Sequence, residues 1–241
     1  MKKLITGLLL LLLVAIAAPQ VGAYPPPLEP MVNTTEEEKK DTKLSMSMEI
    51  PNPYGQLSDL TFVANRKGYM KIFSGLSVSD VTRMWNDFIV LKEIYKVTDV
   101  VIFINSPGGD AFSGLALADH IRRAIEVENF TVTANASGIV ASAAVPVFAV
   151  CQTRQASPGT IFMVHEASLW KWPGQETASD IRAQNELMEL LRSRYINILV
   201  KHTMPDIDPA ERMKRWREME GRTTWFDVNK AKEYGLVDDI R

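Results

Sequence analysis

The sequence has little of what several classes of protein require. It contains a single cysteine, Cys151, among 241 residues, so an internal disulfide is excluded. Its three histidines form no cluster with cysteines or carboxylates at metal-ligand spacing. Basic and acidic residues nearly balance, 27 against 29, which argues against a nucleic-acid surface. Phosphate-binding glycine loops are also missing. We therefore expect no metal, no cofactor, no nucleotide hydrolysis and no nucleic-acid partner.

Long hydrophobic runs are missing too, because the apolar run at residues 5–18 is shorter than the roughly 20 residues of a membrane-spanning helix. A basic start precedes this run and Val-Gly-Ala at residues 21–23 follows it, as in a secretory signal peptide. We expect residues 1–23 to be removed and the protein to be exported to a bacterial periplasm or cell envelope. An uncleaved N-terminal membrane anchor is the alternative.

The remaining chain divides by composition. Residues 24–52 are proline-rich and then charged, without an apolar period, which indicates a flexible or extended arm. Residues 53–241 carry the periodic apolar pattern of one folded domain, and the 46% hydrophobic content of the chain is enough for an ordinary core.

Short β-branched runs alternate with helical periods in this domain, which predicts an α/β fold. We expect strands at residues 60–64, 69–73, 100–104, 130–136, 147–151, 160–164 and 236–237. We expect helices from Ser77 onward, at residues 112–126, at 178–201, after Asp208-Pro209, and at 228–234.

Three chemically distinctive segments follow three of these strands: Ser-Pro-Gly-Gly at 106–109, Gly-Ile-Val-Ala-Ser at 138–142 and Met-Val-His at 163–165. Sites in open α/β folds lie beyond the carboxyl ends of strands, so the three segments are expected to converge. A serine hydroxyl needs a nearby base to act as a nucleophile, and imidazole suits that task.

These residue types predict a site for acyl transfer. Ser142 is the candidate nucleophile and His165 the candidate base. A tetrahedral oxyanion needs preorganised N–H donors, for which we select the amides of Gly109 and Ala143. Gly108 lets the backbone approach an extended substrate without a Cβ in the way.

The three motifs resemble those of ClpP, the proteolytic subunit of Clp protease, within the crotonase-like fold, over roughly residues 68–240. In that family the first turn supplies an oxyanion-hole amide, a Gly-x-Ala-Ala-Ser turn carries the nucleophile and a Met-x-His strand end carries the base. Val140 departs mildly from the second motif. The resemblance implies a repeated ββα superhelix with a long protruding helix after His165.

The third member of the family's triad is where this sequence departs. Counting back from Glu-Tyr-Gly at 233–235, the family's orienting aspartate falls at Thr223. A threonine hydroxyl can hold an imidazole tautomer but brings no charge. Glu220 is the alternative by chemistry, and further carboxylates are Asp206, Asp208 and Asp227. A Ser-His dyad, or a loss of activity, also stays open.

The resemblance predicts an exported serine endopeptidase that cleaves unfolded or extended polypeptide and assembles into rings, stacked through the helix at 178–201. The export signal makes an ATPase unfoldase partner doubtful. The alternatives are a catalytically silent scaffold of the same fold and, third, a crotonase-type acyl-CoA enzyme.

Overall fold

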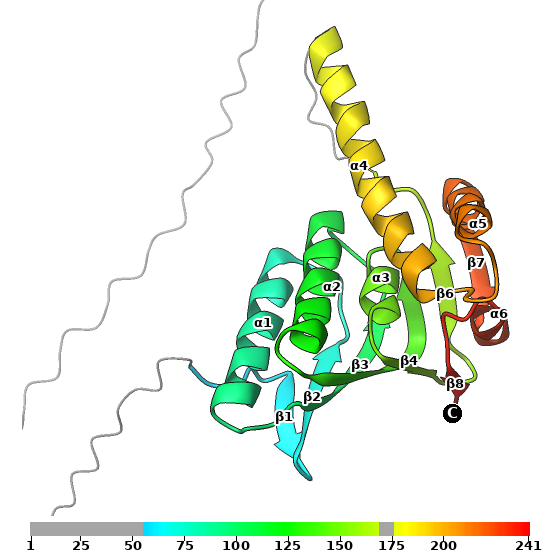
Figure 1. Cartoon of the computed structure of the whole chain (residues 1–241). Helices are drawn as coiled ribbons and strands as arrows, with labels where there is room; N and C mark the ends of the chain where they lie inside the picture. Colours follow the sequence, from blue (N-terminus) through cyan, green and yellow to red (C-terminus); the bar gives the residue numbers. More distant parts are fainter. Residues whose placement is uncertain (1–54, 169–175) are drawn as a thin grey trace, which may run out of the picture. The chain divides into compact units, whose positions relative to one another are not determined.

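The computed structural model describes residues 55–168 and 176–241 (Figure 1). The predicted signal peptide and arm, at 1–23 and 24–52, lie outside the described residues. The described residues fall in one compact unit. Its strands are β1 Thr61–Ala64, β2 Lys67–Ile72, β3 Asp99–Ser106, β4 Thr131–Ala141, β5 Thr153–Ala156, β6 Ile161–Val164, β7 Thr224–Asp227 and β8 Asp239–Ile240. Its helices are α1 Val78–Glu93, α2 Ala111–Glu126, α3 Ala144–Ala149, α4 Ala178–His202, α5 Pro209–Gly221 and α6 Val228–Glu233.

The strands form one mixed sheet in the order β1-β2-β3-β4-β5-β8, and β6 and β7 form a branch from β4. The pairs β1/β2 and β6/β7 are antiparallel, and the remaining pairs are parallel. β4 changes partner along its length, because Thr133–Ala136 pairs with β5 and Ile139–Ala141 with β6. The change falls at Gly138, whose φ of +70° bends the strand toward the branch.

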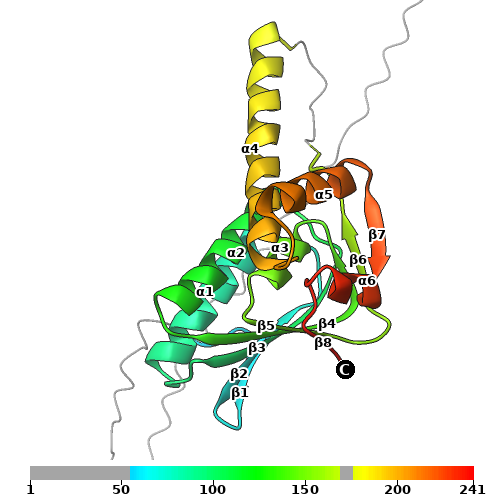
Figure 2. The same ribbon diagram turned by 45° about the vertical axis from the view of Figure 1, so that its right-hand side comes forward.

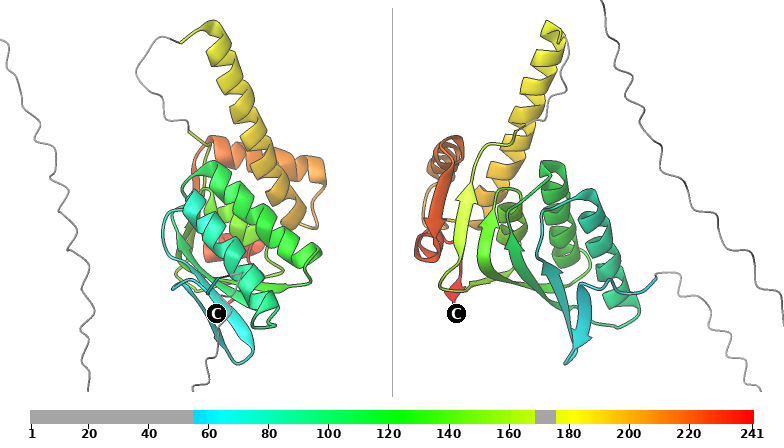
Figure 3. Two further views of the ribbon diagram at one scale, coloured as in Figure 1. Left: turned by 90° about the vertical axis from the view of Figure 1, so that its left-hand side faces the viewer. Right: turned by 180° about the vertical axis from the view of Figure 1, so that it is seen from behind.

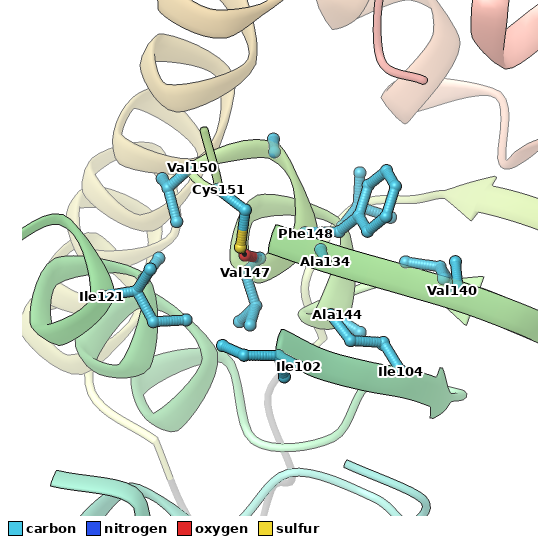
Figure 4. Packing of buried hydrophobic residues seen from close by; sticks show 14 of the residues in the cluster. Ile102, Ile104, Ile121, Ala134, Val140, Ala144, Val147, Phe148, Val150 and Cys151 are labelled. Carbon is cyan, nitrogen blue, oxygen red and sulfur yellow. Dashed lines mark hydrogen bonds between the residues drawn. The ribbon is translucent and has the colours of Figure 1, made fainter. Parts of the chain in front are cut away.

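Helices α1, α2 and α3 cover one face of the sheet, as Figures 1 and 2 show. Between the helices and the strands lies a continuous apolar core that includes Ile102, Ile104, Ile121 and Phe148. In Figure 4 the side chains of β3, β4, α2 and α3 meet in this layer. The α/β class and the crotonase-like arrangement expected from the sequence are therefore confirmed.

Two predicted strands are wrong. The apolar run at 147–151 is not a strand, because α3 occupies Ala144–Ala149 and buries all six of its residues. A run that is apolar on every side fits a buried helix as well as a buried strand, and here the small alanines allow close helix packing. The closing strand lies at Asp239–Ile240 and not at 236–237. Strands β5 and β7 were not predicted.

Helix α4 has two different halves. Its C-terminal half packs on α3 and α5 and buries Leu191, Ile196 and Leu199. Most side chains of its N-terminal half, residues 178–190, are exposed, including Ile181 and Leu190. This half stands clear of the sheet in both views of Figure 3. A long helix after His165 was expected and is present. Among the described residues, no helix is both long and apolar enough to cross a membrane.

Candidate active site

The Ser-Pro-Gly-Gly turn is held by hydrogen bonds of the Ser106 side chain and of the Leu76 main chain. The Ser106 hydroxyl is buried; it donates to the Ser74 carbonyl at 2.7 Å and accepts from the Gly108 amide at 3.2 Å. The Leu76 amide donates to the Gly108 carbonyl at 2.7 Å, so Gly109 lies beside Leu76 as in a short parallel bridge. The turn therefore has a defined position before any substrate binds.

Both glycines of this turn have backbone angles that L-residues avoid, φ +96° at Gly108 and +147° at Gly109. They also have no room for a side chain. A Cβ on Gly108 would lie 2.6 Å from the Ser142 Cβ, and one on Gly109 would overlap the Leu76 backbone. Glycine is therefore required here because the turn and the residue at 142 approach each other so closely.

Ser142 follows directly after β4 and has φ +55°, a conformation that is strained for a residue with a side chain. Its amide donates to the Met163 carbonyl at 2.8 Å, which continues the parallel register that pairs Ala141 with Met163. This register brings the end of β6, and His165 just beyond it, alongside Ser142. The His165 Nε2 lies 2.7 Å from the Ser142 Oγ, within hydrogen-bond distance.

The amides of Gly109 and Ala143 have no hydrogen-bond acceptor among the residues that the structure describes. Both residues line the same cavity as Ser142 and His165. Unpaired donors beside a nucleophile are what a developing oxyanion requires. The geometry thus places together all four residues selected from the sequence for acyl transfer, with Gly108 in contact behind them.

The cavity in front of Ser142 has a volume of about 450 Å³. Most of its wall is apolar, and it is closed by α4 and by the end of α5. Besides the four residues above, its lining includes Asp110, Ala111, Phe112, Leu115, Pro146, Ala167, Ser168, Leu191, Arg192, Tyr195 and Glu220. A peptide side chain of ordinary size fits such a volume.

Tyr195 connects α4 to the nucleophile. Its hydroxyl donates to the Ser142 carbonyl at 3.3 Å, and the same carbonyl also accepts from the Val145 amide at 3.0 Å. Burial raises the pKa of Tyr195 well above its ordinary value, so the phenol stays protonated and remains a donor. The strained backbone at Ser142 is therefore supported from α3 and from α4.

A comparison with protein families matches residues 56–241 to the Clp protease model. The chain belongs to the Clp protease family. It is 30% identical over 173 residues to the ATP-dependent Clp protease proteolytic subunit of Bacteroides thetaiotaomicron, covering 70% of this chain and 73% of that protein. It is 27% identical over 171 residues to the subunit of the same name from Bacteroides fragilis, covering 70% and 77% of the two chains. The resemblance inferred from the motifs is confirmed.

Thr223, which occupies the position of the Clp family's aspartate, makes no hydrogen bond to His165 among the described residues. The antiparallel register of β6 and β7 does bring this part of the chain to the right end of the sheet, because Val164 pairs with Thr224. However, the Thr223 side chain is exposed, its φ is +53°, and no hydrogen bond within the described residues links its hydroxyl to the imidazole.

Glu220, the alternative by chemistry, lines the cavity with His165 and is only 2% exposed. Its Oε2 lies 2.7 Å from the Arg192 Nε of α4. Burial raises the pKa of Glu220 above its ordinary value, and the neighbouring Arg192 opposes that rise. A carboxylate is therefore present in the cavity, but its partner in the structure is an arginine.

The three aspartates considered from the sequence lie elsewhere. Asp208 caps α5 by accepting from the Ala210 amide at 2.8 Å, and Asp227 caps α6 by accepting from the Lys230 amide at 2.8 Å. Asp206 is exposed in the turn before α5. The cavity lining includes none of the three.

Arg192 and Tyr195 are the site residues that sequence reasoning missed. In the sequence, Tyr195 follows the apolar period of residues 178–201, which indicates core packing and gives no sign of a role for its hydroxyl. Arg192 carries no motif, and only its spacing of three residues from Tyr195 hints that the two share a helix face.

The other titratable groups of interest are structural. The Cys151 thiol is buried, and burial raises its pKa to about 12, so it is unreactive. The His120 ring stacks on Trp85 at 4.7 Å. Within the two described ranges, no group of histidines, cysteines and carboxylates has the arrangement to hold a metal ion.

Proposed function

We propose that this Clp family protein is a serine endopeptidase with Ser142 as nucleophile and His165 as general base. The observation that carries the proposal is the 2.7 Å approach of His165 Nε2 to Ser142 Oγ in the wall of the cavity. As Oγ attacks the scissile carbonyl carbon, the hydroxyl proton passes to Nε2. The amides of Gly109 and Ala143 donate to the resulting oxyanion, and the imidazolium then protonates the leaving amine.

The substrate class in this proposal is unfolded or extended polypeptide. Gly109 is exposed beside the nucleophile, so an extended chain approaches this turn without meeting a side chain. Gly108, selected from the sequence for substrate binding, is instead buried, and its N–H and C=O groups are already bonded to Ser106 and Leu76. The mainly apolar cavity then takes one substrate side chain. The two Bacteroides relatives are proteolytic subunits of an ATP-dependent protease, which supports peptide hydrolysis and assembly with other subunits. The assembly we propose is a ring of copies of this chain.

We further propose that the protein is exported to a bacterial periplasm or cell envelope. There it would hydrolyse polypeptides without an ATPase partner. This rests on the signal-like composition of residues 1–23, and an N-terminal anchor is the alternative. Fractionation of cells that produce the full chain tests this part, because a cytosolic, unprocessed product contradicts export.

For the third position of the triad, we propose Glu220 in preference to Thr223. Glu220 is an acid that lines the cavity, whereas Thr223 is exposed and bonded to neither His165 nor Ser142 within the described residues. The second candidate function is a silent scaffold, and the observation that favours it is the pairing of Glu220 with Arg192.

Hydrolysis of unfolded casein by the full chain separates these functions. The endopeptidase predicts fragments whose formation is abolished by Ser142→Ala and by His165→Ala. The scaffold function predicts that even the unchanged protein produces no casein fragments. An acyl-CoA enzyme would instead turn over a thioester and leave casein intact.

A further inference from the structure

The buried carboxylate of Glu220 is an unusual feature of the cavity. It lies in the last turn of α5 with 2% exposure, and it faces the space that Ser142 and His165 also line. A buried carboxylate is destabilising in its charged form unless a cation compensates it. The surroundings of Glu220 therefore decide whether it is charged at the pH at which the enzyme works.

Arg192 supplies that compensation from α4. Its Nε lies 2.7 Å from the Glu220 Oε2, and its Nη1 lies 3.3 Å from Glu166 and 3.7 Å from Glu189. Glu166 and Glu189 are more than half exposed, so water screens their interaction with the arginine. The strong interaction of Arg192 is therefore the one with the buried Glu220.

The pair is close but poorly aligned. Although the two atoms are 2.7 Å apart, neither Arg192 Nε nor Glu220 Oε2 forms a hydrogen bond of good geometry within the part of the chain that the structure describes. The positive charge of Arg192 thus stabilises the carboxylate, while the Glu220 Oε2 can still accept a hydrogen bond. A carboxylate in that state is able to respond to a second positive group in the same cavity.

We infer that Arg192 is a positioning residue of the proposed peptidase, which holds Glu220 charged in the cavity so that Glu220 stabilises the imidazolium of His165. This inference rests on the proposed function. The positive charge appears on the ring when Nε2 takes the proton of Ser142 Oγ and the bond from Oγ to the substrate carbon forms. Because Glu220 is buried, water screens its negative charge less than that of a surface carboxylate, so this charge favours the step beyond hydrogen-bond range.

The inference has a pH signature. Glu220 must be ionised to act, so activity falls as the pH drops through its pKa. Burial raises that pKa, Arg192 and the more distant Arg217 of α5 lower it, and Glu166 in the segment after β6 raises it. Removing the charge at position 192 raises the pKa of Glu220 further, and the acid limb of the activity profile then moves to higher pH.

The experiment compares the full-length protein with Arg192→Gln, Arg192→Lys, Glu220→Gln and the double variant Arg192→Gln/Glu220→Gln. For each, kcat/KM on an internally quenched peptide is measured from about pH 5 to about pH 9, the range in which such groups titrate. We expect Glu220→Gln to lose about tenfold or more, since neutralising the acid of a triad is costly. We expect Arg192→Gln to lose activity at low pH and to recover it as the pH rises, and Arg192→Lys to restore the unchanged profile in large part.

The double variant tests whether Arg192 acts through Glu220. If it does, the double variant is no less active than Glu220→Gln. Its pH profile also lacks the fall in activity at low pH that protonation of Glu220 causes. The double variant also protects the test against misfolding, because removing both charges leaves no buried carboxylate uncompensated. Circular dichroism and thermal unfolding identify any variant that fails to fold.

Arg194→Gln is the matched control. Arg194 lies two residues further along α4, and its guanidinium pairs with Asp119 of α2 at 2.6 Å, outside the cavity. Removing this arginine changes the net charge equally but leaves the surroundings of Glu220 intact. We expect its pH profile to match that of the unchanged protein.

Two results would overturn the inference while leaving the peptidase intact. One is an Arg192→Gln profile that matches the unchanged protein. The other is a double variant whose loss equals the product of the two single losses, because Arg192 would then act independently of Glu220. Absence of any Ser142-dependent hydrolysis in the unchanged protein is a different outcome, and it overturns the proposed function together with the inference.

Discussion

The two walls of the cavity are constructed differently. On one wall, Ser142 and the Gly108-Gly109 turn are held by main-chain hydrogen bonds and by backbone angles that only glycine adopts freely. On the other wall, Glu220 is held by a side-chain ion pair with Arg192 from another helix. Main-chain geometry changes little with pH, whereas an ion pair depends on the charge of both partners.

The two walls should therefore differ in how strongly their contribution to catalysis depends on pH. In the mechanism that we propose, the backbone wall sets the geometry of acyl transfer, and the charged wall sets how strongly the imidazolium is stabilised. Substitutions in the first wall should therefore remove activity at every pH. Substitutions in the second should change its dependence on pH.

The largest effect is expected for the nucleophile and base. Ser142→Ala or His165→Ala should lower hydrolysis at least ~1000-fold, because the proton transfer and the acyl-enzyme both disappear. Peptide hydrolysis at several pH values measures this loss. Ser79→Ala, an exposed serine of α1, is the control and should retain full activity. A Ser142→Ala protein that still cleaves at the normal rate would show that the backbone wall does not carry the nucleophile.

A large effect is also expected for the glycine turn. Gly108→Ala places a Cβ 2.6 Å from the Ser142 Cβ at a backbone angle of φ +96°, so the turn and the nucleophile must separate. Misplacing an oxyanion donor costs about 100-fold to 1000-fold in rate. Gly159→Ala is the matched control, because nothing lies within 4 Å of a Cβ there. Equal kcat values for the two variants would show that the backbone wall does not limit catalysis.

A moderate effect is expected for the contact between α4 and the nucleophile. Tyr195→Phe removes the hydroxyl that donates to the Ser142 carbonyl, which keeps its bond from the Val145 amide. One such hydrogen bond is worth about 1 kcal/mol, or roughly fivefold in rate. Steady-state kinetics beside Tyr95→Phe, an exposed tyrosine, measures the difference. A loss as large as that of Ser142→Ala would place Tyr195 in the chemistry itself.

The smallest effect is expected at Thr223. Its φ of +53° is strained for a β-branched residue, and glycine relieves that strain. Thr223→Gly should therefore raise the free energy of unfolding by about 0.5 to 1 kcal/mol and change kcat/KM less than twofold. Thermal unfolding and peptide hydrolysis report the two quantities. A tenfold loss of activity would instead assign the third position to Thr223.

The sequence allowed prediction of the backbone wall because its signals are local. Gly108, Gly109 and Ser142 each lie at the end of an apolar strand, and strand ends converge in this class of fold. The long helix from Ala178 and the helix after Asp208 were also predictable from their period and caps. The register that joins His165 to Ser142 followed from the fold and not from any single motif.

The charged wall was not predictable in the same way. Glu220 was considered from its chemistry, but nothing local shows that Arg192 of another helix lies 2.7 Å from it. The run at 147–151 misled for a related reason, since continuous burial removes the period that distinguishes a helix from a strand. Both failures concern tertiary packing, which overrides local pattern.

The most direct test of the central claim is the site of labelling by a fluorophosphonate. The full-length protein is treated with the probe, digested and analysed by mass spectrometry. The account predicts one phosphonyl adduct on Ser142, formed as Oγ bonds to phosphorus and fluoride leaves, and no adduct in His165→Ala. A folded protein that shows no adduct, or shows it on another serine, would contradict the assignment of Ser142 as the nucleophile.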